Sequence, residues 1–305
     1  MPLEFELCPG RKIGGSNPCF IIAEIGQNHQ GDVEIAKKMI RMAKSCGADC
    51  VKFQKTELEH RFTKRALARP YTSQHSWGST YGDHKRHLEF SHEQYRELQR
   101  FAQEVGIFFT ASGMDEVSEG RARAGLDCHR QSNKKKMLLL LLLMMIKKSC
   151  LSVQEYQKEF PDIPIGYSGH ESGISVSVAA VALGAKVLER HVSLDKSWKG
   201  SDHAASLEPA ELEALVREIR IVEMAMGSPV KQMLPCEASF RKKLGKSVVA
   251  KKAMKKGTEL TQDMLGVKVA EPEGIAPENI WMVVGKKITV DVEEDDTITN
   301  DMIQD

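Results

Sequence analysis

Polar side chains recur at the ends of short apolar segments of this 305-residue chain, at the points where strands would end. They are Glu24, with Asn28 and His29 just beyond it, Lys52, Gln54, Ser168, His170, Glu189 and His191, and a loop adds Asp202. Carboxylates, an ammonium group and imidazoles can together transfer protons, bind an anion or hold a divalent cation. Such chemistry requires a fold that brings these strand ends to one place.

Two features of this set leave alternatives open. His170 and His191 end consecutive predicted strands and could bind a divalent cation through neutral imidazole nitrogens, although a structural role fits the pattern equally well. Lys52 lies in an apolar segment, and a buried ammonium group needs an anionic partner. A substrate phosphate would serve as that partner, and so would an ion pair with Glu24.

The segments that carry these residues alternate between strand and helix patterns. Five segments have the apolar composition of strands buried on both faces: residues 19–26, 49–54, 106–112, 163–170 and 186–191. Four segments have helical character: residues 33–47, 91–105, 172–183 and 209–226. Residues 91–94 have the form of a capping box at the start of the second, and the apolar residues of the fourth lie on one stripe. This alternation favours a parallel α/β fold, and polar residues at the strand ends favour a (β/α)8 TIM-type barrel.

The predicted strands are too few to close such a barrel. Residues 17–227 supply five, whereas a barrel needs eight, with roughly 30 residues for each βα unit. The missing units should lie in the anomalous segment 117–154, which contains the apolar run Met137–Ile146 between lysines. A translated non-coding insert, a buried strand or helix and a membrane anchor are the alternatives. The anchor is disfavoured because ten apolar residues cannot cross a hydrocarbon core of about 30 Å.

A second, smaller domain is expected after the barrel. We expect the barrel domain at 1–230, a linker at 231–243 and a small β-rich domain at 244–305. In the last of these, Thr258–Leu265 matches Asp296–Ile303 at an offset of 38 residues. The repeat indicates two related halves packed together. It carries no cluster of catalytic side chains, so we expect a capping or dimerisation module.

Composition excludes several classes of partner. The formal net charge is +1, from 43 basic and 42 acidic side chains, so neither a nucleic acid nor a membrane partner is indicated. Seven cysteines are scattered without the spacing of a disulfide framework or a zinc site. With no apolar leader at the start of the sequence, this pattern favours reduced thiols in a cytoplasmic protein.

Five strings, in this order, resemble the sialic acid synthase family: Phe20–Gly31, Val51–Gln54, Gly166–His170, Leu188–His191 and Gly200–His203. The repeat at the C-terminal end resembles the antifreeze-like (SAF) domain of that family. The stretch Tyr81–Ser91 is similar to the branch that makes the 9-phosphate of N-acetylneuraminate from a 6-phosphorylated sugar. The resemblance covers residues 1–116 and 155–305.

The resemblance implies a transferase of sialic acid biosynthesis. It would condense phosphoenolpyruvate with N-acetylmannosamine 6-phosphate, or with N-acetylmannosamine, and release phosphate. Glu24, Lys52 and Asp202 would be catalytic, and His170 and His191 would bind Mg²⁺ or Mn²⁺. Further substrate contacts would come from Gln54, Thr110, Ser112, Ser168 and Glu189. The family resemblance also implies a homodimer in which the C-terminal domain covers the barrel mouth of the partner.

The chain departs from the family pattern between residues 117 and 154. The family's phosphoenolpyruvate contacts on the middle strands have no counterpart there. We therefore expect little or no synthase activity from this exact chain. The alternative to the enzyme is a catalytically inactive product of the same gene that could at most dimerise. Another phosphoenolpyruvate-dependent aldol-type synthase is a third reading, which the antifreeze-like domain disfavours.

Overall fold

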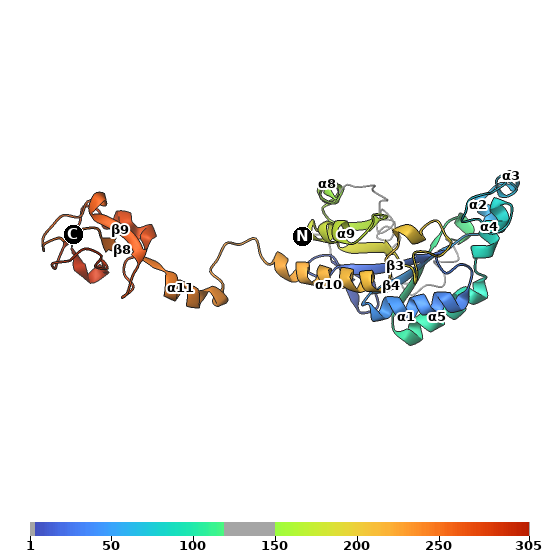
Figure 1. Ribbon diagram of the computed structural model, residues 1–305, viewed down its shortest axis with the longest axis horizontal. Helices are drawn as coiled ribbons and strands as arrows, with labels where there is room; N and C mark the ends of the chain where they lie inside the picture. The colour runs from blue at the N-terminus through green and yellow to red at the C-terminus, as the bar shows by residue number, and fades with distance from the viewer. Residues whose placement is uncertain (1–3, 119–149, 305) are drawn as a thin grey trace. The chain divides into compact units, whose positions relative to one another are not determined.

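The computed structural model describes residues 4–118 and 150–304, and these form two compact units, Met1–Gly227 and Ser228–Asp305 (Figure 1). Each unit has its own buried apolar core. The apolar run Met137–Ile146 lies outside the described residues. The three alternatives for this segment therefore stay predictions. Among the described helices, none is both long and apolar enough to cross a membrane.

The first unit contains a sheet of five strands, all paired in parallel. The strands, in chain order, are β3 (Phe20–Gly26), β4 (Cys50–Lys55), β5 (Phe108–Gly113), β6 (Gly166–Gly169) and β7 (Val187–His191). Their order across the sheet is β5-β4-β3-β7-β6. This is the order of the first three and last two strands of a (β/α)8 barrel. Among the described residues, β5 and β6 are paired on one side only, as expected for an incomplete barrel.

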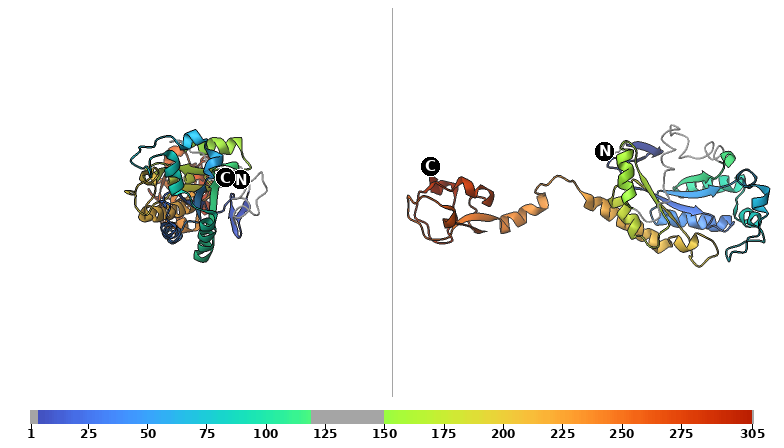
Figure 2. Two further views of the ribbon diagram at one scale, coloured as in Figure 1. Left: turned by 90° about the vertical axis from the view of Figure 1, so that its right-hand side faces the viewer. Right: turned by 90° about the horizontal axis from the view of Figure 1, so that it is seen from above.

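Helices cover the outer face of this sheet, as the alternating pattern predicted (Figures 1 and 2). They are α1 (Val33–Ser45), α5 (His92–Val105), α8 (Leu151–Glu159), α9 (Ser175–Ala182) and α10 (Pro209–Met226). The start of α5 confirms the predicted capping box, because Ser91 Oγ accepts from the Gln94 amide and Gln94 Oε1 accepts from the Ser91 amide. Gly106, with φ of 77°, ends the same helix in the left-handed region that glycine tolerates best.

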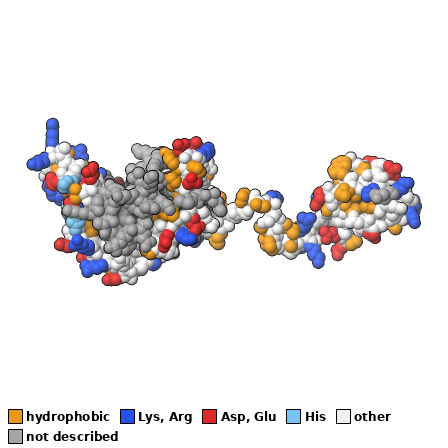
Figure 3. Space-filling view, turned by 180° about the vertical axis from the view of Figure 1, so that it is seen from behind, with side chains coloured by type: hydrophobic (Ala, Val, Ile, Leu, Met, Phe, Trp, Pro, Cys, Tyr) orange, Lys and Arg blue, Asp and Glu red, His pale blue; other side chains and the backbone are white. Residues whose placement is uncertain are grey.

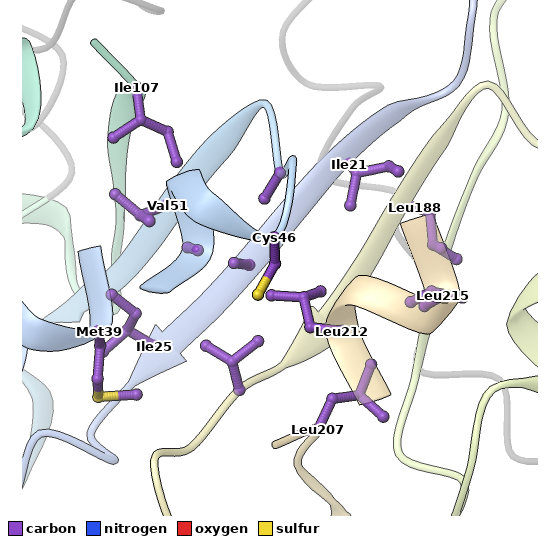
Figure 4. Close-up of a cluster of buried hydrophobic side chains, with 14 of the residues drawn as sticks. Ile21, Ile25, Met39, Cys46, Val51, Ile107, Leu188, Leu207, Leu212 and Leu215 are labelled. Atoms are coloured by element: carbon purple, nitrogen blue, oxygen red, sulfur yellow. The ribbon is translucent and has the colours of Figure 1, made fainter. Parts of the chain in front are cut away.

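Side chains alternate between the two faces of each strand, and each face has its own environment. On β3, Ile21 and Ile25 point outward into the main core, where they meet helix residues such as Met39 and Leu212 (Figure 4). Phe20 and the other inward side chains near the strand starts form a second apolar cluster. The inward side chains become polar only toward the C-terminal ends. This is the end at which barrel enzymes place their active sites.

A hairpin that the sequence analysis did not predict packs on the inner apolar cluster. It consists of β1 (Phe5–Cys8) and β2 (Arg11–Ile13), paired antiparallel. Cys8 and Ile13 are buried against Phe20 and the neighbouring strand starts. The hairpin therefore covers the N-terminal end of the inner face, away from the polar side chains at the C-terminal ends of the strands.

Residues 55–90 form helices that the sequence analysis also missed. They are α2 (Leu58–Arg61), α3 (Lys64–Leu67) and α4 (Tyr81–Leu88). The last of these begins in a capping box between Thr80 and Asp83. A short 3-10 helix, η1 (His203–Ala205), follows β7 later in the chain.

The second unit contains the repeat. Its strands are β8 (Lys246–Ala250) and β9 (Leu265–Val269), paired antiparallel, and β10 (Lys287–Ile288) and β11 (Ile303–Gln304), also antiparallel. Its helices are η2 (Pro235–Glu237), α11 (Ala238–Leu244), η3 (Gln262–Met264), η4 (Pro277–Met282) and η5 (Asn300–Met302). In both copies of the repeat a threonine precedes a 3-10 helix and a strand follows directly. The two sequence copies thus have the same local structure.

Candidate active site

Strand register places four polar side chains in one row across the inner face of the sheet. Glu24 is in register with Lys52 on one side and with His191 on the other. Lys52 is in turn in register with Thr110 on β5. Residues in register on neighbouring parallel strands point to the same face. The sheet therefore brings together side chains that are far apart in the sequence.

Lys52 is held by two carboxylates at the centre of this row. Its Nζ lies 2.8 Å from Glu24 Oε2 and 2.6 Å from Glu189 Oε2. Ser168 Oγ donates a hydrogen bond of 3.0 Å to the other oxygen of Glu189. The Glu24 side chain is 1% exposed, and its Oε1 has no hydrogen-bond partner among the described residues. The carboxylate partner that the sequence offered for Lys52 is thus present, together with a second one.

His170 and His191 lie side by side at the same end of the strands. Their ring centroids are 4.8 Å apart. His191 is buried, and burial lowers its pKa to about 4, with the nearby Asp202 opposing and His170 adding to the shift. His191 is therefore neutral at pH 7. Its Nδ1 is buried and has no hydrogen-bond partner among the described residues.

This arrangement fits a divalent cation. Two neighbouring imidazoles, one of them with an unpartnered ring nitrogen, are suitable ligands. Glu24 and Glu189 share the single ammonium of Lys52, so two acidic side chains and one basic side chain lie beside the rings. Within the described residues, no group of three or more His, Cys, Asp or Glu side chains is arranged to hold a metal ion. A cation bound here would complete its coordination with water or substrate oxygens.

Gly26 is a site residue that the sequence analysis missed. It has φ of 55°, and a Cβ atom on it would lie 3.1 Å from His191 Cε1, 3.2 Å from Glu24 Oε1 and 3.4 Å from Gln54 Nε2. Three predicted site residues therefore converge on this glycine. Gln54 is in register with Ser112, which extends the polar face toward β5. The position of Gly26 as the last residue of a strand with an inward carboxylate was the signal that could have identified it.

Two polar residues beyond Glu24 hold the fold together. Asn28 Nδ2 donates to Val192 O and to Ser206 Oγ, each at 2.8 Å. The buried His29 ring stacks on Phe90 at 3.9 Å between centroids, and burial lowers its pKa to about 3. Asn28 therefore joins the end of β3 to the segment that carries Asp202. Both side chains are satisfied within the protein.

Arg190 is a second residue that the sequence analysis missed. It is 1% exposed, and its guanidinium donates to Glu171 Oε1 at 3.0 Å and to Gly173 O at 2.8 Å. It also contacts Ala205 O at 3.4 Å. Arg190 thus joins the loop that follows His170 to the short helix that follows Asp202. Its place between two inward site residues on β7 makes it point to the opposite, outer face.

Family models match most of the chain. The model described as the NeuB family matches residues 39–124 and 144–231, and the SAF domain model matches residues 245–304. The NeuB match thus stops at residue 124 and resumes at residue 144.

Several proteins align with nearly the full chain. N-acetylneuraminate-9-phosphate synthase of Homo sapiens is 58% identical over 350 positions, covering 99% of this chain and 98% of that protein. The Mus musculus protein of the same name is 56% identical, covering 100% and 98%. Since this chain has 305 residues, at least 45 of the 350 positions aligned with the human protein have no residue in it.

A solved structure shares the fold. The N-acetylneuraminic acid (sialic acid) synthetase of Leptospira borgpetersenii serovar Hardjo-bovis, crystallised with citrate, aligns with a TM-score of 0.63 at 24% identity. The alignment covers 79% of this chain and 97% of that one. The predicted family resemblance is confirmed by these matches together. The chain belongs to the NeuB family and carries a SAF domain at its C-terminal end.

Proposed function

We propose that this chain condenses phosphoenolpyruvate with N-acetylmannosamine 6-phosphate to give N-acetylneuraminate 9-phosphate and phosphate. Two relatives that align with nearly the whole chain, the human and mouse proteins, are named for this synthesis. The observation that carries the proposal is the buried ion-pair cluster of Lys52, Glu24 and Glu189 beside His191. Such a cluster is costly to bury, and at the C-terminal ends of barrel strands it is typical of a catalytic site.

The reaction forms one carbon–carbon bond and breaks one carbon–oxygen bond. Carbon 3 of phosphoenolpyruvate attacks the aldehyde carbon of the open-chain sugar, using the electron pair of its double bond. The aldehyde oxygen takes a proton and becomes a hydroxyl group. Water adds to carbon 2 and gives up a proton. The resulting tetrahedral intermediate loses phosphate, and the oxygen from water becomes the keto oxygen of the product.

The residues of the inner face suit these steps. Glu24 Oε1 has no hydrogen-bond partner in the described part of the chain, so it can accept the proton from the attacking water. Lys52 would hold an anionic group of phosphoenolpyruvate, assisted by the hydroxyl groups of Ser168, Thr110 and Ser112. Gln54 and Asp202 would position the sugar, and Glu189 would orient Lys52 and Ser168. Holding both substrates in one orientation supplies a large part of the rate enhancement.

We further propose that His170 and His191 hold Mg²⁺ or Mn²⁺. The ion would act as a Lewis acid toward the sugar aldehyde when bound. The support is the pair of adjacent rings and the unpartnered Nδ1 of the neutral His191. Calorimetric titration of Mn²⁺ tests it directly: His191→Ala should remove the binding that the unaltered chain shows.

The function is tested by phosphate release from phosphoenolpyruvate that depends on the phosphorylated sugar and a divalent metal. Glu24→Gln should lower the turnover number about 10²-fold or more, since general acid–base catalysis typically contributes that much. Glu34→Gln, which changes an exposed carboxylate on α1, should leave the rate unchanged. Absence of sugar-dependent phosphate release from the unaltered chain would favour the inactive, at most dimerising product instead.

We also propose a cytoplasmic homodimer. The described cysteines are free thiols, as expected in a reducing compartment. Large apolar side chains are exposed between residues 224 and 244: Met224 at the end of the first unit, and Val230, Met233, Phe240 and Leu244 at the start of the second. Figure 3 shows hydrophobic side chains on the surface of the second unit. Exposed apolar surface of this kind is typical of subunit contacts. Light scattering should give twice the chain mass, and Phe240→Asp should shift it toward the monomer.

A further inference from the structure

A phosphorylated sugar carries a dianion on carbon 6, at the opposite end of the open chain from the reacting aldehyde. The proposed reaction leaves that phosphate intact, so a separate group of cations must bind it. Such a group should lie at the rim of the inner face, beyond Glu24 and His191. It should also contain a cation that the protein itself leaves without a carboxylate.

Lys85 on α4 meets these conditions. Its Nζ donates a 2.8 Å hydrogen bond to Gln27 Oε1. Gln27 directly follows Gly26, the glycine on which Glu24, Gln54 and His191 converge. Lys85 is therefore tied to the backbone segment that forms the edge of the candidate site.

Lys85 has no carboxylate within ion-pairing distance among the described residues, although it is only partly exposed. Two other lysines near the strand ends differ in this respect. Lys52 and Lys55 each contact two carboxylates. Removing an ammonium group from water without an anionic partner is unfavourable. Among the described residues, the ammonium group has one neutral amide as its hydrogen-bond partner and lies 5.7 Å from the centroid of the Tyr81 ring. Neither group is an anion, so the charge of Lys85 is available to one.

The surroundings of Lys85 are positive. Its pKa is lowered by burial first and by the Arg61 guanidinium second, while Asp202 and Glu89 oppose the shift. Within the described part of the chain, Arg61 makes no ion pair with a carboxylate, and its guanidinium donates to Thr56 Oγ1 at 3.3 Å. The neighbouring His84 is also affected, because burial and then Lys85 lower its pKa to about 4. Figure 3 shows Lys, Arg and His side chains gathered at this end of the first unit.

The loop that carries Asp202 contacts the segment that precedes α4. Gly200 N donates to His75 Nδ1 at 3.2 Å, and Lys199 Nζ lies 4.3 Å from the centroid of the Trp77 ring. Asp202 is close enough to raise the pKa of Lys85. The residue proposed to position the sugar and the uncompensated lysine thus lie on one rim.

We propose that Lys85, with Arg61 beside it, binds the phosphate of the sugar substrate and makes the site prefer a phosphorylated sugar to the free sugar. This inference rests on the proposed function for the identity of the sugar. The phosphate oxygens would accept a charge-assisted hydrogen bond from Lys85 Nζ, which Gln27 holds in place. Lys85 is thus a specificity-determining residue for the far end of the sugar.

The test measures binding to the full chain by calorimetry, so it does not depend on turnover. The probes are N-acetylmannosamine 6-phosphate, N-acetylmannosamine and phosphoenolpyruvate, each titrated separately. Lys85→Gln keeps a donor for Gln27 and removes the charge. It should weaken binding of the phosphorylated sugar about tenfold or more, the effect of one charge-assisted hydrogen bond. Its affinity for the free sugar and for phosphoenolpyruvate should change less than about twofold.

Two further variants serve as controls. Arg86→Gln alters the next residue of α4, whose exposed guanidinium lies near Glu59 and Asp83, and it should leave all three affinities unchanged. Lys85→Arg keeps the charge and should retain the preference for the phosphorylated sugar. If Lys85→Gln does not fold, Arg61→Gln removes the neighbouring charge instead, and it should weaken binding of the phosphorylated sugar but not of the free sugar.

Several results would overturn the inference. Equal losses for the two sugars would mean that Lys85 contacts a part that they share. A loss confined to phosphoenolpyruvate would assign Lys85 to the phosphate of the other substrate. Failure of the unaltered chain to bind the phosphorylated sugar more tightly than the free sugar would also refute it. Preferential binding without product formation would refute the proposed function and leave the phosphate subsite standing.

Discussion

At the scale of single residues, the charge balance around Lys52 dominates the site. One ammonium group contacts Glu24 and Glu189, which are both buried. Each carboxylate would be strongly destabilising in this interior without its cation. The same contacts also hold the three side chains in the geometry that the reaction would use. The stability of the fold and the proposed function would therefore depend on the same ion pairs.

Replacing Lys52 by methionine should show this dependence. The change leaves two buried carboxylates without a cation, and breaking a buried pair costs about 3–5 kcal/mol. Urea denaturation of the chain, followed through the unfolding transition of the first unit, should show a loss of unfolding free energy in that range. The double variant Lys52→Met/Glu189→Gln should recover part of it, because one of the two charges is removed. A loss below about 1 kcal/mol for the single variant would contradict the prediction.

His29 should make the stability depend on pH. Its pKa is about 3 in the folded chain because the ring is buried, against about 6.5 when unfolded. The unfolded state therefore gains the proton first as pH falls. The stability from this group is complete above pH 6.5 and falls by about 1.4 kcal/mol per pH unit down toward pH 3.

The check compares unfolding free energies at several pH values. His29→Gln should flatten the dependence between pH 6.5 and 4, since glutamine does not titrate and its amide oxygen can still accept the Gly31 amide that now donates to His29 Nδ1. His60→Gln, at an exposed histidine, should leave the slope as it is. Identical slopes for His29→Gln and the unaltered chain would show that another group controls the acid transition.

At the scale of elements, the end of β3 sets the shape of the site. The register with β4 shifts between Glu24 and Gly26. The shift and the positive φ of Gly26 allow the chain to turn away while Glu24 and Gln54 stay close together. A short irregularity at the end of one strand thus makes room for three side chains of the candidate site.

Alanine at position 26 should disturb that arrangement. Its Cβ would press on His191, Glu24 and Gln54 at 3.1–3.4 Å. Displacement of reacting groups by about 1 Å can cost about 10²-fold in rate. Gly10→Ala is a matched control, because Gly10 also has positive φ and nothing lies within 4 Å of its Cβ position. Gly10→Ala should lower stability slightly and leave the turnover number unchanged, and similar rates for the two variants would contradict the prediction.

At the scale of the whole molecule, the first unit has the two ends of a barrel joined through β3 and β7. Within the described residues the sheet has free edges at β5 and β6. Unpaired edges expose backbone donors and acceptors and favour association with other chains. The alignment with the human relative also leaves at least 45 positions without a residue here. Both observations indicate fewer substrate contacts than in a closed barrel.

A chain in which the segment between residues 124 and 144 is replaced by the corresponding longer segment of the human relative should be the better enzyme. We expect kcat/KM for phosphoenolpyruvate to rise by about tenfold or more, since each added charged contact contributes about 1.5–3 kcal/mol. Phosphate release by the two purified chains, at equal sugar and metal concentrations, measures the difference. Equal rates would mean that the longer segment contributes nothing to the site.

Much of the architecture follows from the sequence alone. Patterns between near neighbours in the chain predicted the five strands, the capping box at Ser91 and the amphipathic helix of 209–226. Such patterns act through local backbone preferences. The repeat at 258–265 and 296–303 also predicted two halves with the same local structure. Most of the predicted site residues lie toward the end of a recognisable strand, whereas Asp202 was named from the loop string Gly200–His203 that carries the family resemblance.

Only the tertiary structure decided which of these residues touch. The second carboxylate of Lys52 comes from Glu189, and the partner of Lys85 is Gln27. Both pairs join residues far apart in the chain, and nothing in the local sequence states their distance. The hairpin β1–β2 and the helices α2–α4 escaped prediction because they are short, and tertiary packing stabilises such elements more than their own propensity does. Local patterns determined the strands, whereas strand order and register determined the site.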